Sequence, residues 1–184
     1  ISAMEIEDLP VLQTYQPKQP IVHPADEELR MIAKILNEGQ KVGIYAGAGA
    51  KGAHDEIIAL CKKLQAPMAH TSLAKDFVEW DTDYNNGMTG MQGLQAGYHM
   101  METCDTLLIL GANFAWSQFY PKHARIIQVD INPQHLGLRH AIELGVIGNV
   151  KDTVTALFPY LDEKDDTKYL NEHLKLHQKS SRRC

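Results

Sequence analysis

A glycine-rich turn is the first stretch of this sequence whose residue types could do chemistry. Three glycines, Gly47, Gly49 and Gly52, follow the apolar run 41–46 with the spacing G-x-G-x-x-G. Such a turn can bring backbone N–H groups and a helix N-terminus close to a phosphate, because a side chain there would keep the anion away. Strand-to-helix turns also use glycine for steric reasons alone, so both interpretations stay open. If the turn holds a phosphate, valine at Gly49 should block binding at little cost in folding stability.

An acidic residue ends another apolar run, and its place in the chain is unusual. An ordinary NAD site has an acid about 20 positions past the glycines, at the end of the second strand, where it binds the adenosine ribose. Here the second apolar run, 66–71, ends without an acid, and the acidic residue at a strand end is Asp130. This arrangement disfavours a standard dehydrogenase. Asp130 either binds a ribose or caps its own turn through an Asx hydrogen bond.

The stretch 87–97, "GMTGMQGLQAG", combines four glycines with two methionines just before a predicted helix. Glycines there would let a planar aromatic ligand approach closely, with Met88 and Met91 packing against it and Gln92 meeting its polar edge. The alternative is a loop that crosses another backbone at short distance. The pattern alone does not separate the two.

No other pattern in the sequence predicts a catalytic or metal-binding residue. Nine histidines are present without an H-E-x-x-H motif, and His173 and His177, four apart on a polar helix, are interpreted as a solvated face. There is no G-x-S-x-G elbow and no Cys–His signature. Three cysteines without C-x-x-C indicate neither a disulfide framework nor a zinc site, and they favour a reducing cytoplasm.

Short apolar strands alternating with helices predict an α/β fold, with a Rossmann-like parallel sheet of about five to six strands and helices on both faces. The residues after each strand would then meet at one edge of the sheet. The strands are expected at 41–46, 66–71, 105–111, 124–130 and 141–148. The helices are expected at 25–38, 54–64, 93–104, 149–161 and from about 167, and 72–87 is expected to be loop.

Composition and the positions of proline and other structure-breaking residues divide the chain into three parts. Residues 1–24 hold four prolines and predict a linker from a preceding domain, residues 25–161 form the central domain, and residues 162–184 form a C-terminal connector helix. A net charge of -5 argues against a nucleic-acid partner. The longest apolar stretch is too short to cross a bilayer, so no membrane contact is expected.

Three segments taken in order carry a family resemblance: "YAGAGAKGAH", "NGMTGMQGLQAGYHMMETCDTLLILGANFAWSQFYP" and "IIQVDINPQHLG". Together they resemble the central domain of thiamine-diphosphate-dependent pyruvate oxidases, above all the quinone-linked pyruvate dehydrogenase branch, over roughly residues 20–161. The resemblance implies the middle one of three α/β domains, with FAD bound in an extended pose. It also implies a cytoplasmic enzyme, a tetramer in the intact family, in which the flavin takes two electrons from the intermediate left by pyruvate decarboxylation and passes them to a quinone or oxygen.

Transferred by position, the resemblance implies a set of FAD contacts. The diphosphate would lie near Gly47, Ala48 and Gly49, and the ribityl and flavin side near Thr89, Gly90, Met91, Gln92, Gly111, Ala112, Asn113 and Phe114. The adenosine ribose and adenine would lie near Asp130, Ile131 and Asn132, and the adenine also near Asn149 and Val150. Similar family members often have Asp where Asn149 stands, and Asn149 would equally serve as a helix N-cap.

Family motifs that are absent set the limits of this interpretation. The sequence has no Gly-Asp-Gly motif, so thiamine diphosphate and Mg2+ are expected in other domains of a parent enzyme, and this chain alone should be inactive. Two alternatives stay open. The chain could be the central domain of an acetolactate synthase-like or other thiamine-diphosphate enzyme, with a structural nucleotide or none, or it could be a stand-alone nucleotide-binding module.

Overall fold

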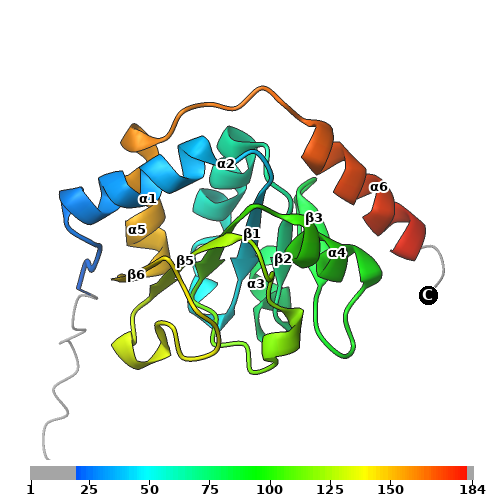
Figure 1. Cartoon of the computed structure of the whole chain (residues 1–184), viewed down its shortest axis with the longest axis horizontal. Coiled ribbons are helices and arrows are strands. Elements are labelled where there is room, and N and C mark those ends of the chain that lie inside the picture. The colour runs from blue at the N-terminus through cyan, green and yellow to red at the C-terminus, as the bar shows by residue number, and fades with distance from the viewer. Residues whose placement is uncertain (1–19, 182–184) are drawn as a thin grey trace, which may run out of the picture.

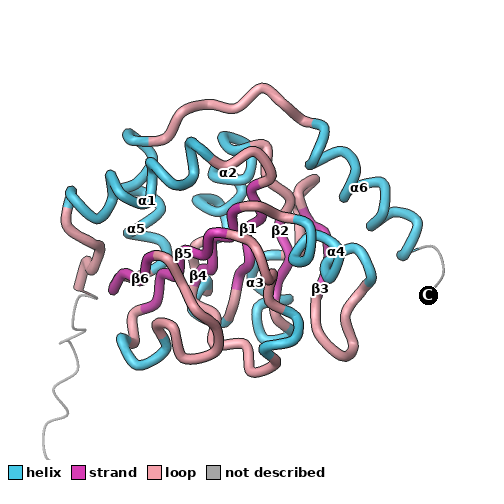
Figure 2. The backbone as a smooth tube through the Cα atoms, viewed as in Figure 1, coloured by secondary structure: helices cyan, strands magenta, loops and turns pink. Residues whose placement is uncertain are grey.

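The computed structural model describes residues 20–181, so most of the predicted linker 1–24 lies outside the described residues. Six strands form one sheet in the order β3-β2-β1-β4-β5-β6, and every neighbouring pair is parallel (Figures 1 and 2). The strands are β1 (Val42–Ala46), β2 (Met68–His70), β3 (Asn85–Met88), β4 (Thr106–Leu110), β5 (Arg125–Asp130) and β6 (Leu144–Ile147). The predicted α/β fold with a Rossmann-like parallel sheet is confirmed.

The central strands β1 and β4 are buried along their whole length, which is why each reads as a continuous apolar run. Their register pairs Ile44 with Leu108, and Ala46 with Leu110 at the carboxyl end. The chain order reverses between them, because β2 and β3 lie beyond β1 while β5 and β6 lie beyond β4. Ligands of open α/β sheets bind at this kind of reversal.

Helices cover both faces of the sheet and enclose two apolar cores. One core lies under α1, α2 and α5, and the other lies under α4 and the start of α6 (Figure 1). The helices are α1 (Asp26–Glu38), α2 (His54–Leu64), α3 (Lys75–Val78), α4 (Gln95–Thr103), α5 (Val150–Leu157) and α6 (Lys168–Ser181). Short 3-10 turns lie at Ala48–Ala50, Ser72–Ala74, Ser117–Phe119, Pro133–His135 and Phe158–Tyr160.

The expectation of loop over 72–87 is wrong in part, because it contains the helix α3 and the start of β3. The strand β3 escaped prediction because its residues are polar: Asn85, Asn86 and Gly87 precede Met88. Both amides are buried and bonded locally. Asn85 Oδ1 accepts from the N–H of Gly87 at 2.8 Å, and Asn86 Nδ2 donates to the carbonyl of Ala96 at 2.8 Å.

The helix α6 lies against α4 and β3 (Figure 1). Its Tyr169 hydroxyl donates to the carbonyl of Met100 on α4 at 2.9 Å. The interpretation of His173 as part of a solvated face is wrong, since its side chain is buried and contacts His99 of α4, with 3.1 Å between His99 Nδ1 and His173 Nε2. The predicted connector helix therefore contributes to the second core.

Buried imidazoles predict how stability depends on pH. Burial is the largest cause that lowers the pKa of His173, and it also lowers the pKa of His70 at the end of β2. An unfolded histidine takes up its proton near a pKa of about 6.5, whereas these folded side chains resist protonation. The free energy of unfolding should therefore be highest above that pH and fall as the pH drops through it, as urea melts at several pH values would show.

A variant separates the contribution of His173 from the rest. His173→Asn should make the pH dependence shallower, because its amide can still donate to the carbonyl of Tyr169, as His173 Nδ1 does at 2.9 Å, but does not titrate. The exposed His123 supplies the control, and His123→Asn should leave the free energy of unfolding close to that of the wild type. Equal slopes in the wild type and His173→Asn would contradict the expectation.

At the opposite side of the sheet, the segment before α1 is fixed to α5. The carbonyl of Val22 accepts from the N–H of Asn149 at 2.7 Å, and the N–H of Val22 donates to Asp152 Oδ2 at 3.2 Å.

Among residues 20–181, no helix combines the length and the apolar character that crossing a membrane would need.

Candidate functional site

A cleft of about 890 Å³ opens along the carboxyl edge of the sheet. It is lined by the loops that follow β1 to β5, and those after β3, β4 and β5 run along the lower part of the view in Figure 1. Pockets that bind drug-sized ligands and cofactors commonly measure about 300–1,000 Å³. The cleft is therefore large enough for an extended ligand.

Most of the residues predicted to contact a cofactor line this cleft. They are Ala48, Gly49, Thr89, Gly90, Met91, Gln92, Gly111, Ala112, Asn113, Phe114, Asp130, Ile131 and Asn132. They come from four loops that are far apart in the sequence, and the sheet brings them to one edge. Their contact with a ligand stays a prediction.

Gly47, Asn149 and Val150 do not line the cleft. Asn149 caps α5, because its Oδ1 accepts from the N–H of Lys151 at 3.0 Å. Val150 is buried in the core beneath α5. The N-cap alternative for Asn149 is therefore present in the structure, whereas the predicted approach of these two residues to an adenine has no support from their position.

The glycine turn after β1 crosses the end of β4 at very short distance. A Cβ atom on Gly47 would lie 2.4 Å from the Cα of Ala112, and one on Gly49 would lie 2.8 Å from the Cα of Gly111. The N–H of Gly47 donates to the carbonyl of Leu110, and that of Gly49 donates to Gly111, each at 2.9 Å. These contacts contradict the expectation that valine at Gly49 would cost little folding stability, and they give both glycines a steric reason to lack a side chain. The phosphate interpretation of the turn stays a prediction.

Asp130 lies at the carboxyl end of β5 and is 5% exposed. Its Oδ1 accepts from the N–H of Asn132 at 2.9 Å, which is the Asx bond expected for a capping role. Its Oδ2 lies 3.0 Å from His135 Nδ1. The same carboxylate lines the cleft, so capping its turn does not remove it from the site.

Two threonine hydroxyls in the cleft lack a hydrogen-bond partner. Thr71 Oγ1 and Thr89 Oγ1 are both buried, and within residues 20–181 neither makes a hydrogen bond. A buried polar atom without a partner costs free energy. Thr71 and Thr89 both line the cleft, so a polar ligand bound there would find two hydroxyls whose hydrogen bonds are not taken by residues 20–181.

The mouth of the cleft is apolar. It is lined by three large hydrophobic residues that are exposed to solvent, Leu73, Met91 and Trp116. The Trp116 ring contacts the Phe114 ring edge-on, with 5.3 Å between the ring centroids. Gly90 has a φ of +115°, and a Cβ there would lie 3.0 Å from the Phe114 ring. A planar apolar group would find van der Waals contacts here that water does not offer.

Several lining residues were missed by the sequence analysis. They are Thr71, Ser72, Leu73, Ala115, Trp116 and His135, whereas Met88, which was expected to pack against a ligand, does line the cleft. Residues 71–73 directly follow β2, and in the sequence only the lack of an acidic residue at the end of this strand had been noted. The position rule that selected Asp130 would have found Thr71, because both residues come at the carboxyl end of a strand.

Nucleophiles and metal ligands do not gather in the described part of the chain. Within residues 20–181 no three His, Cys, Asp or Glu side chains could share a metal ion. Burial raises the pKa of the Cys104 thiol to about 12 and that of Cys61 further, so neither forms a thiolate near neutral pH. The cleft is suited to holding a molecule by shape and hydrogen bonds.

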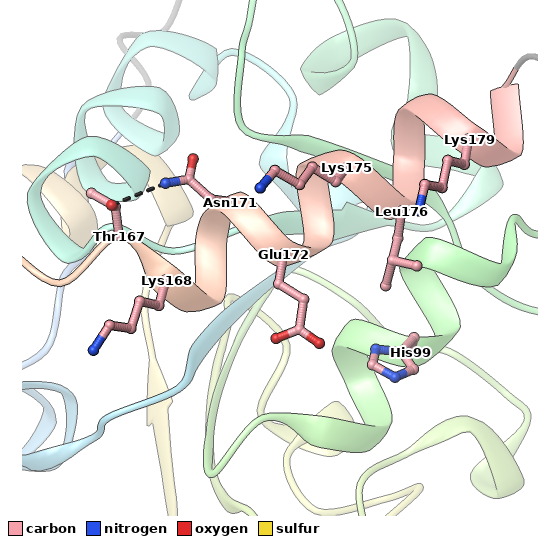
Figure 3. Close-up of a pocket in the computed structure, with 8 residues that line it drawn as sticks. All are labelled: His99, Thr167, Lys168, Asn171, Glu172, Lys175, Leu176 and Lys179. Atoms are coloured by element: carbon pink, nitrogen blue, oxygen red, sulfur yellow. Dashed lines mark hydrogen bonds between the residues drawn. The ribbon is translucent and has the colours of Figure 1, made fainter.

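A second hollow, of about 560 Å³, runs along α6 (Figure 3). Its walls carry exposed charged side chains such as Lys175 and Glu172, with His99 of α4 at one end. Near the start of α6, Asn171 Nδ2 donates to Thr167 Oγ1 at 3.0 Å, and both residues line the hollow. No strand end contributes to it, so it is separate from the cleft.

The model of the family described as thiamine pyrophosphate enzyme, central domain, matches residues 29–157. Over 89% of its length the chain is 42% identical to a 42.6 kDa protein of Pseudomonas amyloderamosa described as uncharacterized, in the isoamylase 3′ region. Over 83% it is 31% identical to the putative thiamine pyrophosphate-containing protein YdaP of Bacillus subtilis, and over 86% it is 27% identical to the probable acetolactate synthase large subunit of Methanocaldococcus jannaschii. The chain spans 41%, 27% and 28% of these relatives, respectively.

Proposed function

The chain belongs to the family of central domains of thiamine pyrophosphate enzymes, and from this premise we propose that it is the nucleotide-holding domain of a larger thiamine-diphosphate-dependent enzyme, with FAD as the nucleotide. The observation that carries the proposal is the cleft at the strand reversal, with two buried threonine hydroxyls that have no hydrogen-bond partner among residues 20–181. Thiamine diphosphate and Mg2+ would be bound by other domains, and the remaining domains and further subunits would be its partners.

The residues of the cleft fit an FAD molecule at both of its ends. Asp130 offers a buried carboxylate at one end, and the apolar group of Phe114, Met91 and Trp116 offers a surface for a flat ring at the other. Thr71 and Thr89, which follow β2 and β3, present hydroxyls that can donate to phosphate or ribityl oxygens. Because the acid follows β5 and not β2, the adenosine would lie over the half of the sheet formed by β4 and β5, opposite to an ordinary Rossmann NAD site.

FAD, when bound, supplies a two-electron acceptor that the side chains of a protein cannot provide. This chain would bind the flavin, orient it and keep water from one of its faces. Two classes of parent enzyme are consistent with that role. The acetolactate synthase among the relatives favours an enzyme in which the nucleotide is structural, while the methionine-containing loop 87–97 favours a pyruvate oxidase, in which the flavin would accept electrons from the thiamine-bound intermediate.

Binding measurements on the purified chain test the proposal. FAD should raise the melting temperature of the chain and lose fluorescence on binding, whereas NAD should leave the melting temperature unchanged, because the NAD-type acid after β2 is absent. Thr71→Val and Thr89→Val remove the hydroxyls and nearly keep the shape, so each should weaken FAD binding by about 3- to 10-fold.

Thr153→Val is the matched control for these variants. Its hydroxyl is also buried without a partner within residues 20–181, but it lies on α5, away from the cleft. It should leave FAD affinity unchanged. Stabilisation by NAD and not by FAD, or equal losses of affinity in all three threonine variants, would overturn the proposed function.

A further inference from the structure

The side chain of His135 connects Asp130 to Asn132 at the edge of the cleft. His135 Nδ1 lies 3.0 Å from Asp130 Oδ2, and Asn132 Nδ2 lies 3.2 Å from His135 Nε2. The backbone of His135 is held as well, since its carbonyl accepts from Gln128 Nε2 at 3.0 Å and its N–H donates to the carbonyl of Asn132 at 3.1 Å. Hydrogen bonds with Asp130, Asn132 and Gln128 therefore fix both the side chain and the backbone of His135.

The hydrogen bonds determine which ring nitrogen carries the proton. Asn132 Oδ1 accepts from the N–H of Gln134 at 3.0 Å, so the amide nitrogen of Asn132 is the atom that faces His135. That nitrogen is a donor, so His135 Nε2 accepts and His135 Nδ1 carries the hydrogen. His135 Nδ1 then donates to Asp130 Oδ2 without needing a positive charge.

This network leaves the Asp130 carboxylate with one free acceptor position on each oxygen. A carboxylate has about four acceptor positions. The N–H of Asn132 takes one on Oδ1, and His135 takes one on Oδ2. Because both oxygens are held, the carboxylate cannot rotate about its Cβ–Cγ bond without losing a bond. Two neighbouring hydroxyl groups of one sugar can each donate to one of the remaining positions.

We propose that His135 is a positioning residue, which locks the Asp130 carboxylate in the orientation that accepts both hydroxyls of the adenosine ribose. This inference rests on the proposed binding of FAD, and it adds that the site distinguishes an unmodified adenosine ribose from one that carries a 2′-phosphate. A ribose with both hydroxyls free is accepted, whereas a phosphate on the 2′ oxygen would meet the negative carboxylate without a donor. His135 itself lines the cleft and is partly exposed, with 31% of its side chain open to solvent.

The test compares FAD with FMN, which lacks the adenosine half. His135→Ala should weaken FAD binding roughly tenfold and leave FMN binding unchanged, because only FAD has a ribose that reaches Asp130. His135→Asn should restore FAD affinity, since an Asn amide nitrogen can take the place of His Nδ1. His135→Gln places its amide nitrogen nearer the position of Nε2 and should not restore it. Titrations followed by flavin fluorescence measure all four proteins.

Each alternative result has a distinct meaning. Equal FAD affinity in His135→Ala and the wild type overturns the inference, and so does an equal loss of FAD and FMN, which would indicate general damage to the cleft. Recovery by His135→Gln but not by His135→Asn also overturns it, because the wrong nitrogen would then be responsible. A wild-type chain that binds neither flavin refutes the proposed function itself. Melting temperatures of the variants establish that each one is folded.

Discussion

Valine in place of Gly111 should lower the free energy of unfolding by more than about 4 kcal/mol, enough to leave little folded protein. Gly111 has a φ of +59°, which a β-branched residue avoids, and a Cβ there would lie 2.5 Å from the Cα of Gly49. The obstructing atoms belong to the backbone, so no side chain can rotate away. Urea denaturation followed by circular dichroism measures the loss.

Gly52→Ala is the matched control for that substitution. Gly52 also has a positive φ, +80°, but nothing lies within 4 Å of the position of its Cβ. Only the backbone conformation is then penalised, by about 1–2 kcal/mol. If Gly111→Val cost no more than Gly52→Ala, the turn after β1 would not be held by contact with the end of β4, and the steric account of the glycines would fail.

Alanine in place of Asp130 should weaken FAD binding by about 1.5–3 kcal/mol, or about 10- to 150-fold. The substitution removes an ionised acceptor from the end of the cleft. It also leaves the N–H of Asn132 and the Nδ1 of His135 without their acceptor, so part of the loss comes from a less ordered turn. Fluorescence titration with FAD gives the affinity, and urea melts of the same protein give the stability.

Asp105→Ala separates those two effects. The Asp105 carboxylate also accepts from backbone N–H groups, those of Gln40 and Lys41, but it lies before β4, at the edge of the sheet opposite the cleft. This variant should lose stability and keep its FAD affinity. An Asp130→Ala protein with wild-type affinity would leave Asp130 with the capping role alone.

The parts of the fold that the sequence predicted are those in which one force dominates. β1, β4 and β5 are buried strands of a parallel sheet, so burial alone makes them apolar and easy to recognise. The strand β3 is held by amide side chains that bond to nearby backbone, and no periodic pattern reveals such bonds. His173 was misplaced for a related reason, because it is buried by the packing of the polar helix α6 against its neighbours, including His99 of α4.

The candidate site shows a similar division. Asp130 could be found because a charge that ends a buried strand requires an explanation. Thr71 shares the position at a strand end but carries no charge, and His135 lies in the turn after β5, so neither residue type stands out in the sequence. Their importance comes from what surrounds them in the described part of the chain: the buried Thr71 hydroxyl has no partner there, and His135 has a partner on each ring nitrogen. The glycine turn was found correctly, but its close backbone contact could only be seen in three dimensions.

The contact between the turn after β1 and the end of β4 also bears on how such a domain can change over generations. The glycines that permit the contact have no freedom to mutate, while exposed side chains at the mouth, such as Met91, can be exchanged without disturbing the sheet. A lineage can thus drift in its preference for one cofactor over another, or abandon cofactors altogether, and still inherit a domain that folds.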